Sequence, residues 1–105
     1  MTSQTADETP RTFATPAIDV LENDVELLVM ADLPGVGKGD VKLSFEDDNL
    51  ILHATHRAGR HVFRRTVPIG HQVQADHIEA ELDHGVLTVH LPKADEARPR
   101  QIPIR

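Results

Sequence analysis

The sequence of 105 residues has no cysteine, no excess of positive charge and no long apolar run. Without cysteine there is no disulfide framework and no thiolate chemistry, which fits a reducing compartment, so we expect a cytoplasmic protein. A net charge of −6 at pH 7 argues against nucleic-acid partners, because neutralising phosphates requires a basic face. No window approaches the roughly 20 apolar residues of a membrane span, and the N-terminus does not resemble a secretory signal. We expect one soluble domain with no membrane partner.

Motifs for catalysis and cofactor binding are also scarce. The stretch GVGKGD lacks the Ser or Thr that follows the lysine of a phosphate-binding loop, and no predicted helix follows it. The only serines, Ser3 and Ser44, lie in a polar N-terminal segment and within a predicted strand, where a nucleophile–base pair is not expected. The EDDN stretch at 46–49 lacks the later ligands of a calcium loop and is more simply a solvated turn. We therefore predict a non-enzyme without cofactors.

The charge is unevenly distributed along the chain. Residues 49–75 contain no acid but four arginines and four of the seven histidines, whereas residues 1–48 contain eleven acids. The middle of the chain becomes more basic as its histidines are protonated near pH 6. If Ala58 and Gly59 form a two-residue turn, His56 and His61 lie opposite each other and could share a metal. Two ligands make a weak site, so we predict no bound metal.

Alternation of apolar and polar residues, typical of half-buried strands, recurs along the chain. It predicts seven strands, at residues 17–22, 25–33, 40–47, 49–56, 61–69, 77–83 and 85–91. Turn-forming residues separate them. Short strands at this spacing predict an all-β fold, an immunoglobulin-like antiparallel β-sandwich of two sheets, over residues 17–92.

The two ends differ from this pattern. Residues 1–16 are polar, contain two prolines and predict a short flexible arm. Residues 93–105 predict a flexible tail that carries Ile102, Pro103 and Ile104. The two isoleucines are spaced for one face of a strand, which is unusual for an otherwise polar tail.

Four pieces of the chain, in this order, resemble the α-crystallin domain of the small heat-shock proteins, the Hsp20 family. They are DLPGV before a strand, FRR in the middle, AELDHGVLTVHLPK, and the final Ile-x-Ile. The family's turn motif falls on Ala80, Gly85, Val86 and Leu87. The resemblance covers roughly residues 16–105 and implies a stress-response chaperone that works without ATP. Such a holdase binds partly unfolded client proteins and prevents their aggregation.

The resemblance also implies a role for the tail. In this family the Ile-x-Ile segment adds as a short strand to an edge groove, which here corresponds to residues 40–46 and 77–82. The implied docking motif is Ile102, Pro103 and Ile104. The implied groove residues are Val41, Leu43, Phe45, Ile78, Ala80 and Leu82.

Departures from the family pattern concern self-association. Only RAGR separates the strands at 49–56 and 61–69, too short for the extra strand that bacterial and plant members exchange. Animal relatives with a compact connection pair the second of these strands with its own copy, which implies a homodimer or small oligomer. The candidate interface residues are His61, Val62, Phe63, Arg64 and Arg65. An inward-leaning Arg65 would need acidic partners from elsewhere in the fold or from another subunit.

Two other functions stay open. One is a CS/p23-like co-chaperone or adaptor sandwich that binds a folded partner. The other is a pH-responsive or metal-responsive binding module built on the basic hairpin. The Ile-Pro-Ile segment and the Gly-Val-Leu run favour the holdase, because the adaptor class lacks that segment.

Overall fold

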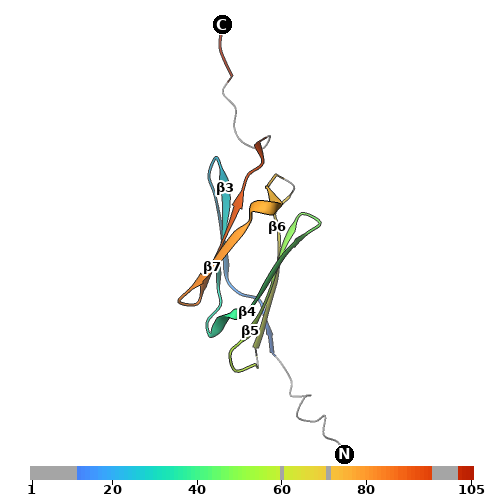
Figure 1. The fold of residues 1–105 in the computed structure, drawn as a ribbon, viewed down its shortest axis with the longest axis vertical. Helices are drawn as coiled ribbons and strands as arrows, with labels where there is room; N and C mark the ends of the chain where they lie inside the picture. Colours follow the sequence, from blue (N-terminus) through green and yellow to red (C-terminus); the bar gives the residue numbers. More distant parts are fainter. Residues whose placement is uncertain (1–11, 60, 71, 96–101) are drawn as a thin grey trace, which may run out of the picture.

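The computed structural model describes residues 12–59, 61–70, 72–95 and 102–105, which form two four-stranded sheets packed face to face (Figure 1). The first sheet has the strand order β1 (Thr12–Ala14), β6 (His61–Pro68), β5 (Asn49–His56) and β4 (Val36–Glu46). The second has the order β2 (Ile18–Glu22), β3 (Glu26–Asp32), β8 (Val86–Pro92) and β7 (Glu79–Asp83). A short 3-10 helix, η2 (Ala75–His77), leads into β7. The expected all-β sandwich is confirmed.

Alternate residues of three inner strands supply most of the core. Successive side chains of a strand point to opposite faces of its sheet, so every second residue faces the other sheet. The buried residues of β3, β5 and β8 are Leu27, Val29, Ala31, Leu50, Leu52, Ala54, Leu87, Val89 and Leu91. Burying each of the larger side chains stabilises the fold by about 1.5–3 kcal/mol.

Two hairpins turn through pairs of residues with positive φ. His84 (φ 50°) and Gly85 (φ 78°) connect β7 to β8, and Asp47 (φ 52°) and Asp48 (φ 64°) connect β4 to β5. Positive φ at both central positions gives the turn whose twist matches paired strands. Gly85, a residue of the family's turn motif, thus has a backbone conformation that glycine adopts without steric cost. Its carbonyl also accepts a hydrogen bond from the Leu33 N–H (2.7 Å), which ties the turn to the end of β3.

The strands differ from the expected ones in three places. β4 begins at Val36, inside the glycine-rich stretch expected to be a turn, because a register shift between Val36 and Val41 lets the strand continue through it. β7 begins only at Glu79, since the preceding residues form η2. An eighth strand, β1, lies within residues 1–16, which were expected to be a flexible arm. It pairs parallel with β6, at Thr12↔His61, Phe13↔Val62 and Ala14↔Phe63.

Candidate docking groove and self-association edge

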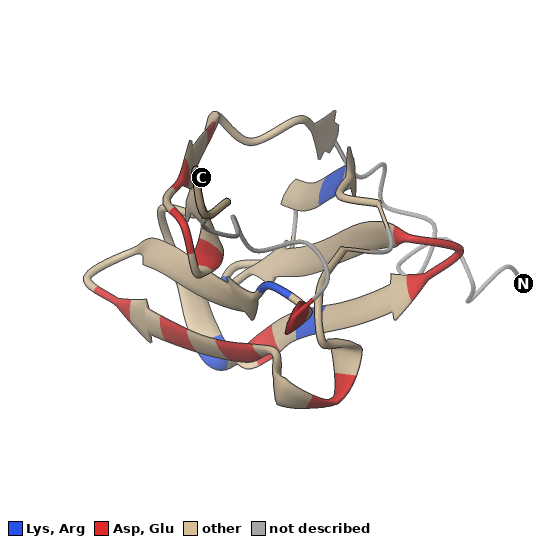
Figure 2. Cartoon of the chain, turned by 90° about the horizontal axis from the view of Figure 1, so that it is seen from above, with Lys and Arg blue, Asp and Glu red and all other residues tan. Residues whose placement is uncertain are grey.

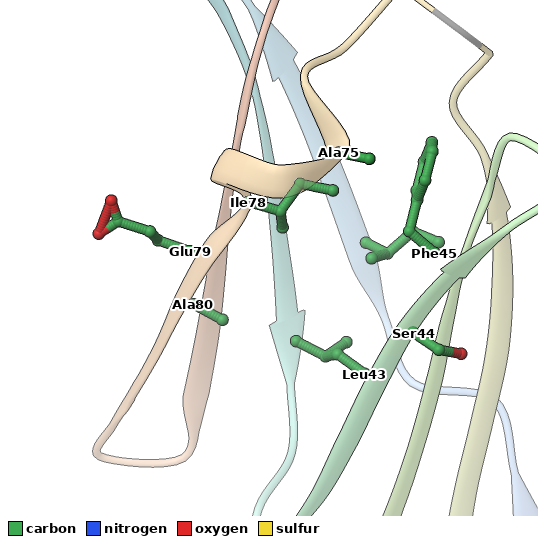
Figure 3. A pocket seen from close by; sticks show the side chains of 8 residues that line it. Leu43, Ser44, Phe45, Ala75, Ile78, Glu79 and Ala80 are labelled. Carbon is green, nitrogen blue, oxygen red and sulfur yellow. The ribbon is translucent and has the colours of Figure 1, made fainter.

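A groove runs between β4 and β7, which are the edge strands of the two sheets and lie on the same side of the sandwich (Figure 1). It contains two cavities, of about 340 Å³ and about 200 Å³. The larger is lined by Leu43, Ser44, Phe45, Leu50, Ala75, Ile78, Glu79 and Ala80 (Figure 3). The smaller is lined by Lys38, Val41, Leu43, Ala80, Glu81, Leu82 and Leu87.

The structure brings all six sequence-predicted groove residues together at this place. Leu43 and Ala80 line both cavities, and their side chains point toward each other from β4 and β7 (Figure 3). Ala80, whose side chain is a single methyl group, thus lies where the two cavities adjoin. Alternate residues of an extended segment lie about 6.6–6.8 Å apart, so two adjacent cavities suit two side chains of an Ile-x-Ile segment.

Several groove residues were not predicted from the sequence. Ala75 reaches the larger cavity from η2, where no strand alternation could indicate its position. Glu79 and Glu81 contribute to the β7 wall of the cavities, but the Glu79 side chain points away from the larger cavity, on the side of β7 opposite Leu43 (Figure 3). Alternation predicts this direction, since both residues flank Ala80 and therefore face the opposite side of the strand. The groove is therefore apolar inside, with acidic groups along β7.

The Ile-Pro-Ile segment lies outside the groove of its own chain. Ile102 is 81% exposed and Ile104 is 95% exposed. These are the two most exposed large apolar side chains of the described residues. A single copy of the chain thus presents both an empty apolar groove and an uncovered apolar segment of matching spacing.

The candidate self-association residues lie on β6, but part of its outer edge is covered by β1. Val62 is buried in the sandwich at 2% exposure, whereas His61 and Arg64 are exposed. β5 pairs with one edge of β6, and β1 covers the other edge at residues 61–63. Self-pairing along the whole strand, as expected from the sequence, therefore requires β1 to leave. With β1 in place, only residues 64–68 offer this edge to another chain.

Two arginines of β6 hold the segment that contains β1. The Arg64 guanidinium lies 4.8 Å from the ring centroid of Phe13, a cation–π contact. Arg65 Nη1 donates a hydrogen bond to the Pro16 carbonyl (3.4 Å). Arg65 was expected to need acidic partners, and the contact observed is a backbone carbonyl. The one aromatic residue of the N-terminal segment, Phe13, was the available sequence signal for this contact.

The two histidines of the β5–β6 hairpin lie opposite each other, as expected. The rings of His56 and His61 are in edge-to-face contact, 5.5 Å between centroids and 85° between planes. The Ala58 N–H donates to His56 Nδ1 (3.0 Å), and the His56 ring fills the space beside Gly35, where a Cβ would come within 2.1 Å of it. Within the described part of the chain, no group of three or more His, Asp or Glu side chains could hold a metal. The two histidine rings therefore pack against each other beside the turn between β5 and β6.

His90, on the outer face of the second sheet, joins three strands. Its Nδ1 lies 3.1 Å from Glu26 Oε1 on β3, and its Nε2 lies 3.5 Å from Glu81 Oε1 on β7. The hydrogen bond to Glu26 raises the pKa of His90 above its usual value, with a smaller contribution from Glu81. The His90 side chain thus links β7, one wall of the groove, to β3 in the middle of its sheet.

Among the charged residues that the structure describes, Asp and Glu outnumber Lys and Arg (Figure 2). Among these residues no helix is long and apolar enough to cross a membrane.

The fold and the sequence have clear relatives. The model of the Hsp20/alpha crystallin family matches residues 19–105. The peroxisomal 16.0 kDa heat shock protein of Oryza sativa subsp. japonica is 35% identical over 113 residues, covering 87% of this chain and 77% of that protein. The 18 kDa antigen 1 of Mycobacterium intracellulare is 32% identical over 109 residues, covering 89% and 72%.

A solved structure is similar over almost the whole chain. Heat shock protein 16.0 from Schizosaccharomyces pombe superimposes with a TM-score of 0.71 at 27% identity, covering 98% of this chain and 90% of that one. The CS/p23-like adaptor is not favoured by these relatives, whereas the chaperone function implied by the resemblance is confirmed. This chain belongs to the Hsp20/alpha crystallin family of small heat-shock proteins.

Proposed function

We propose that this small heat-shock protein is an ATP-independent holdase that binds partly unfolded proteins in the cytoplasm and uses its own tail for reversible assembly. The observation that supports this most directly is the open apolar groove between β4 and β7 in a chain that leaves Ile102 and Ile104 uncovered. Exposed apolar surface of this kind is retained where it binds something.

The groove receives the Ile-Pro-Ile segment of a second copy. Ile102 and Ile104 fill the two cavities, and Pro103 faces away from them, where its ring keeps the backbone extended. Burying two isoleucines contributes about 3–6 kcal/mol before the costs of association are subtracted. The net affinity is then modest, as reversible assembly requires.

Small heat-shock relatives self-associate into oligomers. For this chain we propose a homodimer or small oligomer, because the connection between β5 and β6 is limited to residues 57–60. An exchanged strand does not fit into that connection. The tail–groove contact and the β6 edge are then the two available routes of association.

The holdase proposal is tested by heating an aggregation-prone model enzyme with the purified protein in the absence of ATP. We expect lower light scattering at an equimolar ratio. An inert globular protein of similar size, at the same concentration, controls for crowding. Unchanged scattering at this ratio would refute the holdase proposal for this chain.

A further inference from the structure

Lys93, the first residue after β8, is the only charged residue that is buried within the described part of the chain, at 6% exposure. Its Nζ lies 2.5 Å from Glu22 Oε2 at the end of β2. A lysine is rarely buried without a partner, because desolvating its ammonium group is costly. The Lys93–Glu22 ion pair thus links the start of the tail to β2, the edge strand of the second sheet that lies farthest from β7.

Backbone hydrogen bonds hold the same position from two sides. The Lys93 N–H donates to the Val25 carbonyl in the β2–β3 hairpin (2.8 Å), and the Ala94 N–H donates to the Gln72 carbonyl (2.7 Å). Gln74 Nε2 donates to the Lys93 carbonyl (3.0 Å). Residues 93 and 94, expected to belong to a flexible tail, are therefore part of the folded sandwich. The point from which the tail leaves is fixed by the fold.

This junction also contacts the segment that builds one end of the groove. The Gln74 N–H donates to the Pro92 carbonyl (2.8 Å). Gln74 directly precedes η2, whose Ala75 lines the larger cavity together with Ile78. The start of the tail, at residues 93 and 94, and the segment that lines one end of the larger cavity are thus held together by these hydrogen bonds.

We propose that Lys93 and Glu22 form a positioning pair that fixes the direction in which the tail leaves the sandwich, and so decides which neighbouring groove the Ile-Pro-Ile segment reaches. This inference rests on the proposed docking function. A tether with a fixed exit samples fewer orientations, which raises its effective concentration at one groove and lowers it at others. The pair acts through the tail and does not itself touch the docked segment.

The test compares assembly sizes of full-length variants by sedimentation velocity at equal protein concentration. Lys93→Met keeps an unbranched side chain in the buried site and removes its charge. Glu22→Gln changes the exposed partner and leaves the buried lysine in place. Lys42→Met, on the exposed face of β4, removes the same charge elsewhere. We expect loss of the dominant assembly for Lys93→Met, a smaller shift for Glu22→Gln and the wild-type distribution for Lys42→Met.

A second background separates positioning from a purely structural role. Each variant is repeated with Ile102→Ala and Ile104→Ala, and thermal unfolding is recorded in parallel. A positioning pair has no further effect on assembly once the isoleucines are absent, whereas a structural role lowers the unfolding temperature and changes the size distribution equally in both backgrounds. If Lys93→Met does not unfold cooperatively, Glu22→Gln decides the question.

The outcomes distinguish this inference from the function on which it rests. If the isoleucine variant changes the assembly but Lys93→Met and Glu22→Gln do not, the positioning role is wrong and docking stands. If the isoleucine variant leaves the assembly unchanged, docking itself is wrong and the positioning role falls with it.

Discussion

The edge formed by β4 and β7 is open, apolar inside and acidic along β7, whereas the outer edge of β6 is basic and half covered by β1. The residues that the family resemblance implies for each edge lie on the expected strands, the groove residues on β4 and β7 or just before β7 and the self-association residues on β6. The two edges differ in what covers them, and that depends on segments distant in the sequence. Strand alternation therefore predicts which residues share one face of a strand, but it does not predict which edge is available to a partner.

The charges of the two edges reinforce this difference. Self-pairing of β6 brings Arg64 and Arg65 near their own copies, and residues 49–75 contain no acid to compensate. The tail, in contrast, carries arginines in its sequence on both sides of the Ile-Pro-Ile segment, and Glu79 and Glu81 lie beside the cavities. Opposite charges thus favour the tail–groove contact, and like charges oppose the β6 contact.

Removing the apolar side chains of the tail should have the largest effect. Ile102→Ala with Ile104→Ala deletes most of the buried area of docking, up to about 3–6 kcal/mol before association costs, so assemblies that depend on the groove should disappear. The unfolding temperature should change little, because both side chains are exposed in the single chain. Light scattering coupled to size exclusion measures the assemblies.

Pro103→Ala is the matched control for this variant, since Pro103 is proposed to face away from the cavities. It should retain most of the assembly. If the double isoleucine variant has the wild-type size distribution, the open edge does not bind the tail.

The acidic rim should have a smaller effect. Glu79→Lys reverses a charge on the outer side of β7, next to the larger cavity, and should weaken docking of the basic tail by up to about 1 kcal/mol at low salt, with the difference shrinking as salt screens it. Asp83→Lys, on the same strand but outside both cavities, controls for the net charge. If the two variants change assembly equally, the net charge of the protein explains the effect and the position of Glu79 next to the cavity does not.

Uncovering β6 tests the other edge. Phe13→Ala removes the cation–π contact with Arg64, worth about 0.5–1 kcal/mol at an exposed site, and should loosen β1. If β6 is a self-association edge, the dimer fraction in sedimentation should rise. Val25→Ala, an exposed apolar residue in the β2–β3 hairpin, is the control. An unchanged dimer fraction despite faster amide hydrogen exchange in β6 would exclude this edge.

Much of the fold and of the groove was predictable from the sequence, because strand alternation depends on neighbouring residues. Alternation put Leu43 and Ala80 each on an apolar strand face, the resemblance to the family located the groove between these strands, and both residues line its cavities. The strand β1 was missed, because three residues without clear alternation acquire their structure from a partner strand 49 residues further along the chain. The burial of Lys93 was missed for a similar reason, since its partner Glu22 is 71 residues away. The structure of such positions depends on partners that are distant in the sequence, and local alternation does not indicate those partners.

The smallest expected effect concerns the link between β7 and the centre of its sheet. The pKa of His90 is raised in the folded protein, chiefly by the hydrogen bond to Glu26. Stability from this group is therefore fully present below the unfolded pKa of about 6.5 and is lost as the pH rises through the higher folded value. The side chain is 40% exposed, so solvent screens the contact and the contribution stays below about 1 kcal/mol.

His90→Gln should remove this pH dependence while keeping a hydrogen-bonding side chain between the strands. Glu79 is the residue of β7 that pairs with His90 in the strand register, and it is unchanged in this variant. Chemical denaturation of both proteins at several pH values between 5.5 and 8.5 measures the difference in unfolding free energy. A difference that grows as the pH rises would contradict the assigned sign, because the charged imidazolium, and with it the advantage of histidine over glutamine, is present at low pH.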